Sequence, residues 1–283
     1  GAEVLALVGN LAWDDDEHGG QIPGFAKARS AGSLLKPFLF AQALDRGLML
    51  PRWQAADVPM DLDGWTPHNY DGVWEGLVAF DEALRRSRNV PFVGLLRELG
   101  VEPFLGRLRQ LGAAHLDPRP GWYGLSAAIG GVELTPLEVA DMYVTLASGG
   151  SRRSLRIVRD SGAPFRSATR MFTPGAAWLT QVALERDGAS WKTGTSYGHR
   201  DAWAAGAGRG LVAVVWLGNF DNRGSAQLVG ADIAGPLLHD LLRALGEPEP
   251  SASPPPPPDL ATVKVCPLSG RLATEACPST APS

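Results

Sequence analysis

The run from Ala31 to Leu44 constrains this chain more than any other stretch, because it is apolar apart from Ser33, Lys36 and Gln42. A spacing of three residues places Ser33 and Lys36 on one face of a helical turn. The surrounding leucines and phenylalanines disfavour the charged form of a lysine, and a neutral amine beside a hydroxyl gives an activated nucleophile. The alternative is an ordinary serine near a helix N-terminus and a lysine that extends to water, and the motif alone does not decide between them.

A second polar motif follows the next predicted helix. Residues 78–86 have a helical pattern, and Asn89-Val90-Pro91 then breaks it, since the residue before a proline avoids the helical conformation. The sequence therefore predicts that Ser87 and Asn89 lie on a turn between two helices.

The third motif is Lys192-Thr-Gly-Thr-Ser196, which precedes two apolar or alternating segments, 202–207 and 211–217, that are typical of paired strands. Ser-x-x-Lys, Ser-x-Asn and Lys-Thr-Gly in this order are the signature of serine penicillin-binding proteins and β-lactamases. The chain has 4 lysines against 22 arginines, and Lys36 and Lys192 both fall inside these motifs. In a chain that uses arginine for general positive charge, such lysines indicate places that need a compact amine able to lose its proton.

The chain resembles the transpeptidase domain of bifunctional, class A penicillin-binding proteins, and it is most like the 1C type. Two positions depart from the common pattern of this family, namely Leu34 after the serine, where a small polar residue is usual, and Arg88 in the middle of Ser-x-Asn. These departures bear on substrate detail and not on the chemistry. The resemblance rests on Arg29–Phe38, Pro67–Gly72, Ser87–Pro91, Gly130–Glu138, Lys192–Ser196, Asp201–Trp203 and Val265–Gly270.

The resemblance implies a role for each motif residue. Ser33 is the expected nucleophile and Lys36 its base, while Ser87 relays the proton and Asn89 holds Lys36 and the substrate amide. Substrate binding is expected from Lys192, Thr193, Gly194 and Thr195, and the backbone N–H groups of Ser33 and Thr195 are expected to form the oxyanion hole. No cofactor and no metal are expected.

The activity that the resemblance implies is serine-type D,D-transpeptidation, which cross-links peptidoglycan stem peptides through an acyl-enzyme on Ser33 and is blocked by β-lactams. A D,D-carboxypeptidase, or a penicillin-binding sensor or tether without turnover, remains an alternative. A class A β-lactamase is disfavoured because Glu102–Gly106 lacks the asparagine of a deacylating segment. The full-length protein is expected to carry a membrane anchor and a glycosyltransferase domain and to act at the periplasmic face of the inner membrane. A net charge of −4 with mixed signs gives no case for nucleic acid.

The predicted fold class is α+β, because a strand is followed by many helices and then by antiparallel strands and a last helix. The resemblance implies a sheet flanked by helices with an inserted helical subdomain. We expect a catalytic domain over residues 1–247, a proline-rich linker over 248–258 and the start of a small β-rich module over 259–283. An apolar content of 45% is enough for a full core.

Four local features complete the predictions. Glu3 to Val8 is suited to a buried strand, and Thr135-Pro-Leu-Glu138 has the spacing of a helix capping box. Trp65, His68, Asn69 and Tyr70 either line a substrate groove, with Trp122 and Tyr123, or pack the long connection that contains them. Cys266 and Cys277 suit a disulfide in an oxidising compartment, with free thiols or half of a metal site as the alternatives.

Overall fold

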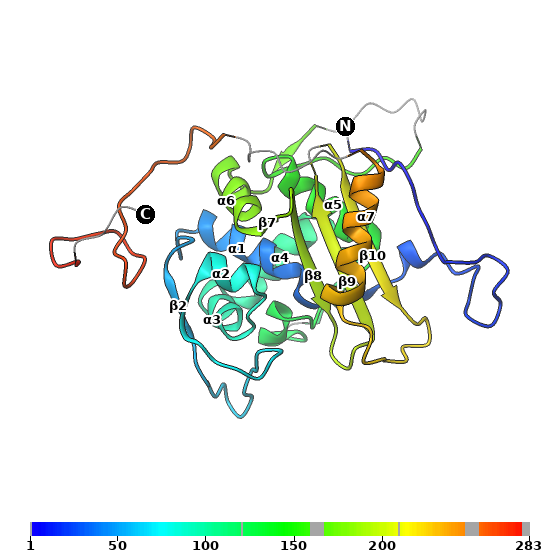
Figure 1. The fold of residues 1–283 in the computed structure, drawn as a ribbon, viewed down its shortest axis with the longest axis horizontal. Coiled ribbons are helices and arrows are strands. Elements are labelled where there is room, and N and C mark those ends of the chain that lie inside the picture. Colours follow the sequence, from blue (N-terminus) through cyan, green and yellow to red (C-terminus); the bar gives the residue numbers. More distant parts are fainter. Residues whose placement is uncertain (1, 120, 159–166, 209, 247–254, 279–283) are drawn as a thin grey trace.

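The computed structural model describes residues 2–119, 121–158, 167–208, 210–246 and 255–278, and its central element is an antiparallel sheet. The strand order is β10 (Val212–Gly218), β9 (Asp201–Ala207), β8 (Ala189–Thr195) and β7 (Glu185–Arg186). Figure 1 shows helix α7 (Gly235–Ala244) across one face of this sheet and α5 (Pro136–Ala147) beyond the other. The predicted strands 202–207 and 211–217 are confirmed as β9 and β10.

Strand β9 is buried on both faces, which explains its lack of polar residues after Asp201. Trp203 and Ala205 belong to the main core, whereas Ala204 between them packs with Leu238 and Leu242 of α7. Successive side chains of a strand point to opposite faces, so one strand supplies both cores. The sheet is thus a layer between helices, and the predicted α+β class is confirmed.

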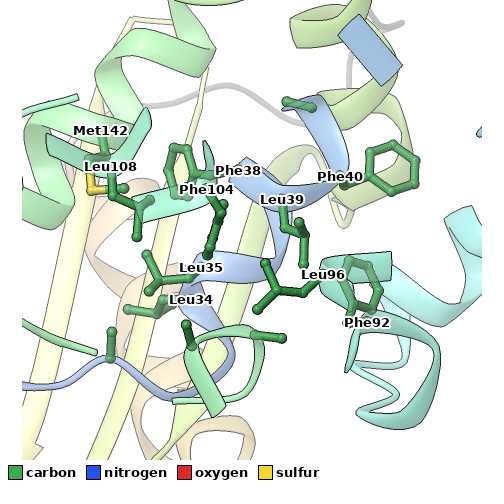
Figure 2. Close-up of a cluster of buried hydrophobic side chains, with 14 of the residues drawn as sticks. Leu34, Leu35, Phe38, Leu39, Phe40, Phe92, Leu96, Phe104, Leu108 and Met142 are labelled. Atoms are coloured by element: carbon green, nitrogen blue, oxygen red, sulfur yellow. The ribbon is translucent and has the colours of Figure 1, made fainter. Parts of the chain in front are cut away.

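The helical region lies beside the sheet and is built around helix α1 (Lys36–Asp45). Figure 2 shows Leu34, Leu35 and Phe38 beside residues of α4 (Val101–Gln110) and α5, while Leu39 faces Leu96 and Phe92 of α3 (Val90–Leu99). All of these side chains are buried. A helix that is apolar on every side requires partners on every side, which is why the run from Ala31 to Leu44 forms the centre of the molecule.

The other elements are short and connect these layers. They are η1 (Gly24–Ala26), β1 (Arg29–Ser30), η2 (Gly32–Leu35), β2 (Gln54–Asp57), β3 (Gly76–Ala79), α2 (Phe80–Arg85), α3 (Val90–Leu99), α4 (Val101–Gln110), η3 (Gly124–Ala128), β4 (Glu133–Leu134), β5 (Ser151–Arg152), β6 (Thr169–Arg170), α6 (Pro174–Leu184) and η4 (Gly230–Ala234).

The capping box at Thr135 is confirmed. The Thr135 hydroxyl accepts the N–H of Glu138 at 3.1 Å, and the Glu138 carboxylate accepts the N–H of Thr135 at 2.7 Å. The predicted helix over 78–86 is confirmed in part, because Val78 and Ala79 pair with β2 before α2 begins at Phe80. This strand pairing takes precedence over the helical pattern of the first two residues.

The prediction of a buried strand from Glu3 to Val8 is wrong. Leu5 and Val8 are 73% and 80% exposed, and the segment meets the chain near Arg156 through the N–H of Val4 and the carbonyl of Ala2. A strand needs a ladder of hydrogen bonds along its length, and an isolated bridge at Glu3 does not provide one.

The C-terminal segment packs on the helical region. The Asp259 carboxylate accepts the N–H of Gly175 at 2.9 Å, Ser269 O accepts the N–H of Gln54 at 3.0 Å, and the Arg271 guanidinium lies 4.7 Å from the Trp53 ring centroid. Both cysteines are free thiols here. The first part of the predicted linker, 248–254, lies outside the described residues, so the domain boundaries stay predictions. Among the described helices, none is long and apolar enough to cross a membrane.

Candidate active site

Ser33 lies on the single-turn helix η2, directly before α1, and three distant segments fix the backbone around it. The N–H of Ala31 donates to Val132 O at 2.9 Å, Tyr143 Oη donates to Leu34 O at 3.1 Å, and Trp203 Nε1 donates to Ser30 O at 2.8 Å. These bonds come from residues of the main core, on both its helical and its sheet side. The position of Ser33 is therefore set by the fold and not by the local sequence alone.

The turn of Ser33 is pressed against the strand of the third motif through a glycine. Gly32 has a φ of +54°, which favours glycine, and a Cβ atom there would lie 2.8 Å from Thr195 N and from Thr195 O. Strand β7 pairs with β8 at Ala189 and Ser190, and farther along β8 packs against η2. The end of β8 thus lies beside Ser33, as the resemblance implied.

Lys36 is fully buried, and its amine reaches the second motif. Nζ donates at 2.7 Å both to Ser87 O and to Asn89 Oδ1, and it lies 3.4 Å from Ser87 Oγ. Burial lowers the pKa of Lys36 well below its ordinary value, and the charges of Lys192 and Arg88 lower it further. A neutral amine has two N–H groups, both used by these 2.7 Å bonds, so its lone pair is left to accept a proton.

Ser87 sits between the two motif lysines. Its φ of +59° lies in the left-handed region that non-glycine residues avoid, and such strain persists only where the surroundings hold it. Ser87 Oγ accepts a hydrogen bond from Lys192 Nζ at 2.8 Å and lies within reach of Lys36. The strained turn thus places one hydroxyl between two amines, a geometry suited to proton relay.

Lys192 is 1% exposed, and its Nζ also donates to Thr193 O at 2.8 Å. Burial, followed by the nearby positive charge of Arg186, lowers the pKa of Lys192 from 10.5 to about 7. Lys192 therefore titrates near neutrality, whereas a lysine on the surface stays charged up to about pH 10.

The structure brings the three motifs together. Lys36, Ser87, Asn89 and Lys192 share a set of hydrogen bonds, and Ser33 and Thr195 are joined by the backbone contact at Gly32. Gly194 is required by a second close approach, since a Cβ there would lie 2.6 Å from Ala31 O. The Thr195 hydroxyl accepts the N–H of Gly230 at 3.0 Å. Within the described ranges, no cluster of three or more His, Cys, Asp and Glu side chains is placed to hold a metal ion.

The sequence left open whether the segment from Trp65 to Tyr70 lines a groove. In the structure Asn69 is buried, and its Oδ1 accepts the N–H of Asn89 at 2.8 Å, so this residue supports the second motif. Tyr70 is exposed and its ring lies 5.8 Å from that of His199, which follows the third motif. The groove interpretation stays a prediction for Trp65 and Trp122, both of which are exposed.

Two groups of residues that support the site were not found from the sequence. Tyr143 and Trp203 hold the Ser33 turn, and the signal for them was weak because each looks like an ordinary core aromatic. Asp57 is fully buried and contacts Arg88, whose position inside Ser-x-Asn was noted only as a departure. A buried arginine requires an acidic partner, so an acidic residue in the long connection was the sequence feature that could have indicated this pair.

Comparison with known proteins agrees with this geometry. The family model of the penicillin binding protein transpeptidase domain matches residues 2–207. The chain belongs to this family. The match covers all three motifs.

Curated relatives include penicillin-binding protein 1C of Escherichia coli, which is 33% identical over 251 residues, covering 84% of this chain and 32% of that protein. Penicillin-binding protein 1B of Vibrio cholerae is 32% identical over 265 residues, covering 81% of this chain and 32% of that protein. The predicted likeness to class A penicillin-binding proteins of the 1C type is confirmed. The chain spans about a third of the length of these relatives.

Solved structures confirm the fold. Penicillin-binding protein 1A of Haemophilus influenzae aligns with a TM-score of 0.75 at 20% identity, over 91% of this chain and 48% of that one. PonA1 of Mycobacterium tuberculosis, solved in complex with penicillin V, aligns with a TM-score of 0.69 at 20% identity, over 83% of this chain and 74% of that one.

Proposed function

We propose that this transpeptidase domain cross-links peptidoglycan stem peptides by serine-type D,D-transpeptidation. The observation that carries the proposal is the buried amine of Lys36, held by Ser87 and Asn89 with a lowered pKa, one helical turn from Ser33. This arrangement supplies a base for a hydroxyl nucleophile without a histidine.

The first half-reaction forms an acyl-enzyme. Ser33 Oγ attacks the carbonyl between two D-alanines while Lys36 takes the hydroxyl proton, and the backbone N–H groups of Ser33 and Thr195 stabilise the oxyanion. The C–N bond then breaks, Ser87 relays the proton to the departing D-alanine amine, and the ester on Ser33 remains. Asn89 orients Lys36 and the substrate amide throughout.

Substrate binding falls to the end of β8. Charged Lys192 and the hydroxyls of Thr193 and Thr195 hold the terminal carboxylate, and Gly194 keeps the strand close to Ser33. In the second half-reaction the amine of another stem peptide attacks the ester, a new amide forms, and the proton of that amine passes through Lys36 back to Ser33. No metal or cofactor takes part in either step.

The surroundings of the domain are part of the proposal. The class A relatives suggest a full-length protein with a glycosyltransferase domain and a membrane anchor at the periplasmic face of the bacterial inner membrane. Peptidoglycan stem peptides are the proposed substrates, and β-lactams are the proposed inhibitors.

Labelling with a reporter penicillin and mapping by mass spectrometry tests the nucleophile. A β-lactam presents a strained amide and a carboxylate in the arrangement of the D-Ala-D-Ala bond, so we expect a stable ester on Ser33 and none in Ser33→Ala. Label on another residue, or none on folded protein, contradicts the assignment of Ser33.

Transfer is separated from hydrolysis by a competition assay. A D-Ala-D-Ala thioester is offered with increasing concentrations of a stem-peptide amine, and both products are followed. A positioned amine competes well against loosely held water, so the ratio of amide to acid should rise with amine concentration. A ratio that stays constant assigns a D,D-carboxypeptidase, and an ester that forms but never turns over assigns a sensor or tether.

A further inference from the structure

Arg88 lies between Ser87 and Asn89, yet its side chain is turned away from them into the protein. It is 4% exposed and contacts the fully buried Asp57, with Nε and Nη2 at 2.9 and 2.8 Å from Asp57 Oδ2. Its Nη1 reaches Asp71 Oδ2 at 2.7 Å, and Nη2 donates to Val73 O. A planar guanidinium with several directed donors therefore ties this turn to the long connection after β2.

Asn69 links Asp57 to the backbone of Asn89. A carboxylate only accepts hydrogen bonds, so Asp57 Oδ1 forces Asn69 to present its Nδ2, at 2.6 Å. The amide oxygen must then face the opposite way, where it accepts the N–H of Asn89 at 2.8 Å and that of Val90 at 3.3 Å. Asp57 thus orients both Arg88 and Asn69. Arg88 directly precedes Asn89, and Asn69 binds the backbone at Asn89, so the two side chains fix the turn together.

The Asn89 side chain is oriented in the same manner. Its Nδ2 donates to His68 O at 2.8 Å, which leaves Oδ1 to accept from Lys36 at 2.7 Å. The connection from Asp57 to Val73 therefore determines which atom of Asn89 meets the lysine. Ser87, two residues before Asn89, has the left-handed backbone that only a fixed environment maintains.

We propose that Asp57, Asn69 and Arg88 are positioning residues that hold the Ser87 carbonyl oxygen and the Asn89 amide oxygen on Lys36. This inference rests on the proposed function, because it gives these residues a role in the acylation of Ser33. They act through the turn and not on the substrate, so their loss should slow the acylation step more than it weakens substrate binding.

Charge provides a second readout. Arg88 adds a positive charge near Lys36 and helps to lower its pKa, after the larger effects of burial and of Lys192. The other charged groups around these residues are Asp57, Asp71 and Glu75, which face Arg88, and Arg186, which acts on Lys192. A double replacement of Asp57 and Arg88 by neutral residues removes the positive charge that acts on Lys36 and leaves Asp71 without its partner, so the pKa of Lys36 should rise.

The experiment measures acylation by a reporter penicillin as a function of its concentration, which separates apparent affinity from the limiting rate. In Arg88→Lys and in the double variant Asp57→Asn/Arg88→Gln, we expect the limiting rate to fall about tenfold or more, with affinity within about threefold of wild type. The lysine keeps the charge but cannot reach Asp57 and Asp71 together, and the double variant replaces the ion pair with a neutral pair of similar shape.

The pH profile separates positioning from a general loss of structure. The rising limb of the acylation rate should shift to higher pH in the double variant and stay in place in Arg88→Lys, which retains the charge. The matched control is Arg243→Gln, which removes an arginine of α7 that pairs with Asp240 at 2.5 Å on the surface. This control should acylate within about twofold of wild type, as is usual for exposed ion pairs.

Each outcome has one meaning. Absence of label on wild-type Ser33 overturns the proposed function itself. If wild type is labelled, two results overturn the positioning role. One is a limiting rate reduced less than tenfold in a variant that folds, and the other is a loss confined to apparent affinity. If neither variant folds, Asn69→Ser decides in their place, because it keeps every charge and should show the same slow limiting rate.

Discussion

The pKa of Lys192 leads to a prediction about the alkaline side of the acylation profile. Lys192 is proposed to hold the substrate carboxylate, and this requires its charged form. With a pKa of about 7, it is half charged at pH 7. The charged fraction is then about a tenth at pH 8 and about a hundredth at pH 9. Wild-type acylation efficiency should therefore fall about tenfold for each pH unit above 8, following this fraction.

The perturbation is Lys192→Arg. A guanidinium keeps its charge up to about pH 12, so the alkaline fall should disappear while the rising limb from Lys36 remains. The rising limb has the opposite sign, because Lys36 must be neutral to accept the proton from Ser33. The fixed charge of the arginine continues to lower the pKa of Lys36 as Lys192 does.

The assay is the second-order rate constant of penicillin acylation from pH 5 to 10, and the readout is the ratio of efficiencies at pH 9 and pH 7 within each protein. Arginine is larger than lysine and Lys192 is buried, so the variant should be slower at every pH, but this ratio removes that offset. Lys27→Arg makes the same replacement at an exposed position and should reproduce the wild-type ratio. Equal ratios in wild type and Lys192→Arg, or a flat wild-type profile between pH 7 and 9, refute the assignment.

Three further predictions follow from the geometry. Lys36→Arg should reduce acylation of Ser33 by about a thousandfold, because a guanidinium cannot act as a base, and retained acylation at any pH up to 9 contradicts the role of Lys36. Gly32→Ala should destabilise the domain by about 1–3 kcal/mol in denaturant unfolding and slow acylation, since the added Cβ meets backbone at 2.8 Å; an unchanged unfolding midpoint counts against the close approach. Cys266 and Cys277 should form a disulfide on mild oxidation, seen as the loss of two hydrogens by mass spectrometry, because hydrogen bonds from Ser269 and Cys277 lower the pKa of the Cys266 thiol to about 7. This disulfide should leave acylation within about twofold of the reduced protein, and a larger effect places the C-terminal segment within the catalytic domain.

The sequence predicts much of the site because its polar residues interrupt apolar surroundings. Lys36 is noticeable for this reason, and Lys192 because lysine is rare in a chain that uses arginine for positive charge; the structure buries both amines beside Ser87. Capping at Thr135 was predictable since its hydrogen bonds join residues three apart. These signals lie within a few residues of the chain, so they can be recognised without knowledge of the fold.

The parts that the sequence did not predict depend on contacts between distant segments. Nothing within Glu3 to Val8 indicates that the segment lacks a partner strand, because strand formation depends on a neighbour elsewhere. Likewise, Asp57 and Arg88 are 31 residues apart, and each resembles a surface charge until they are seen buried together. By sequence Arg88 is only a departure from a motif, whereas in the structure it binds Asp57 and Asp71 of the connection on which it packs.

The contacts at Gly32, Gly130 and Gly194 have a consequence for how such a domain loses its activity. At each position a single methyl group would meet backbone from another segment, at 2.8 Å for Gly32 and Gly130 and at 2.6 Å for Gly194. A copy of this domain could therefore retain every serine, lysine and asparagine of its motifs and still be inactive through one alanine. Inventories of catalytic side chains would count such a copy as an enzyme. The glycines that let the segments touch are the positions at which a silenced duplicate is best recognised.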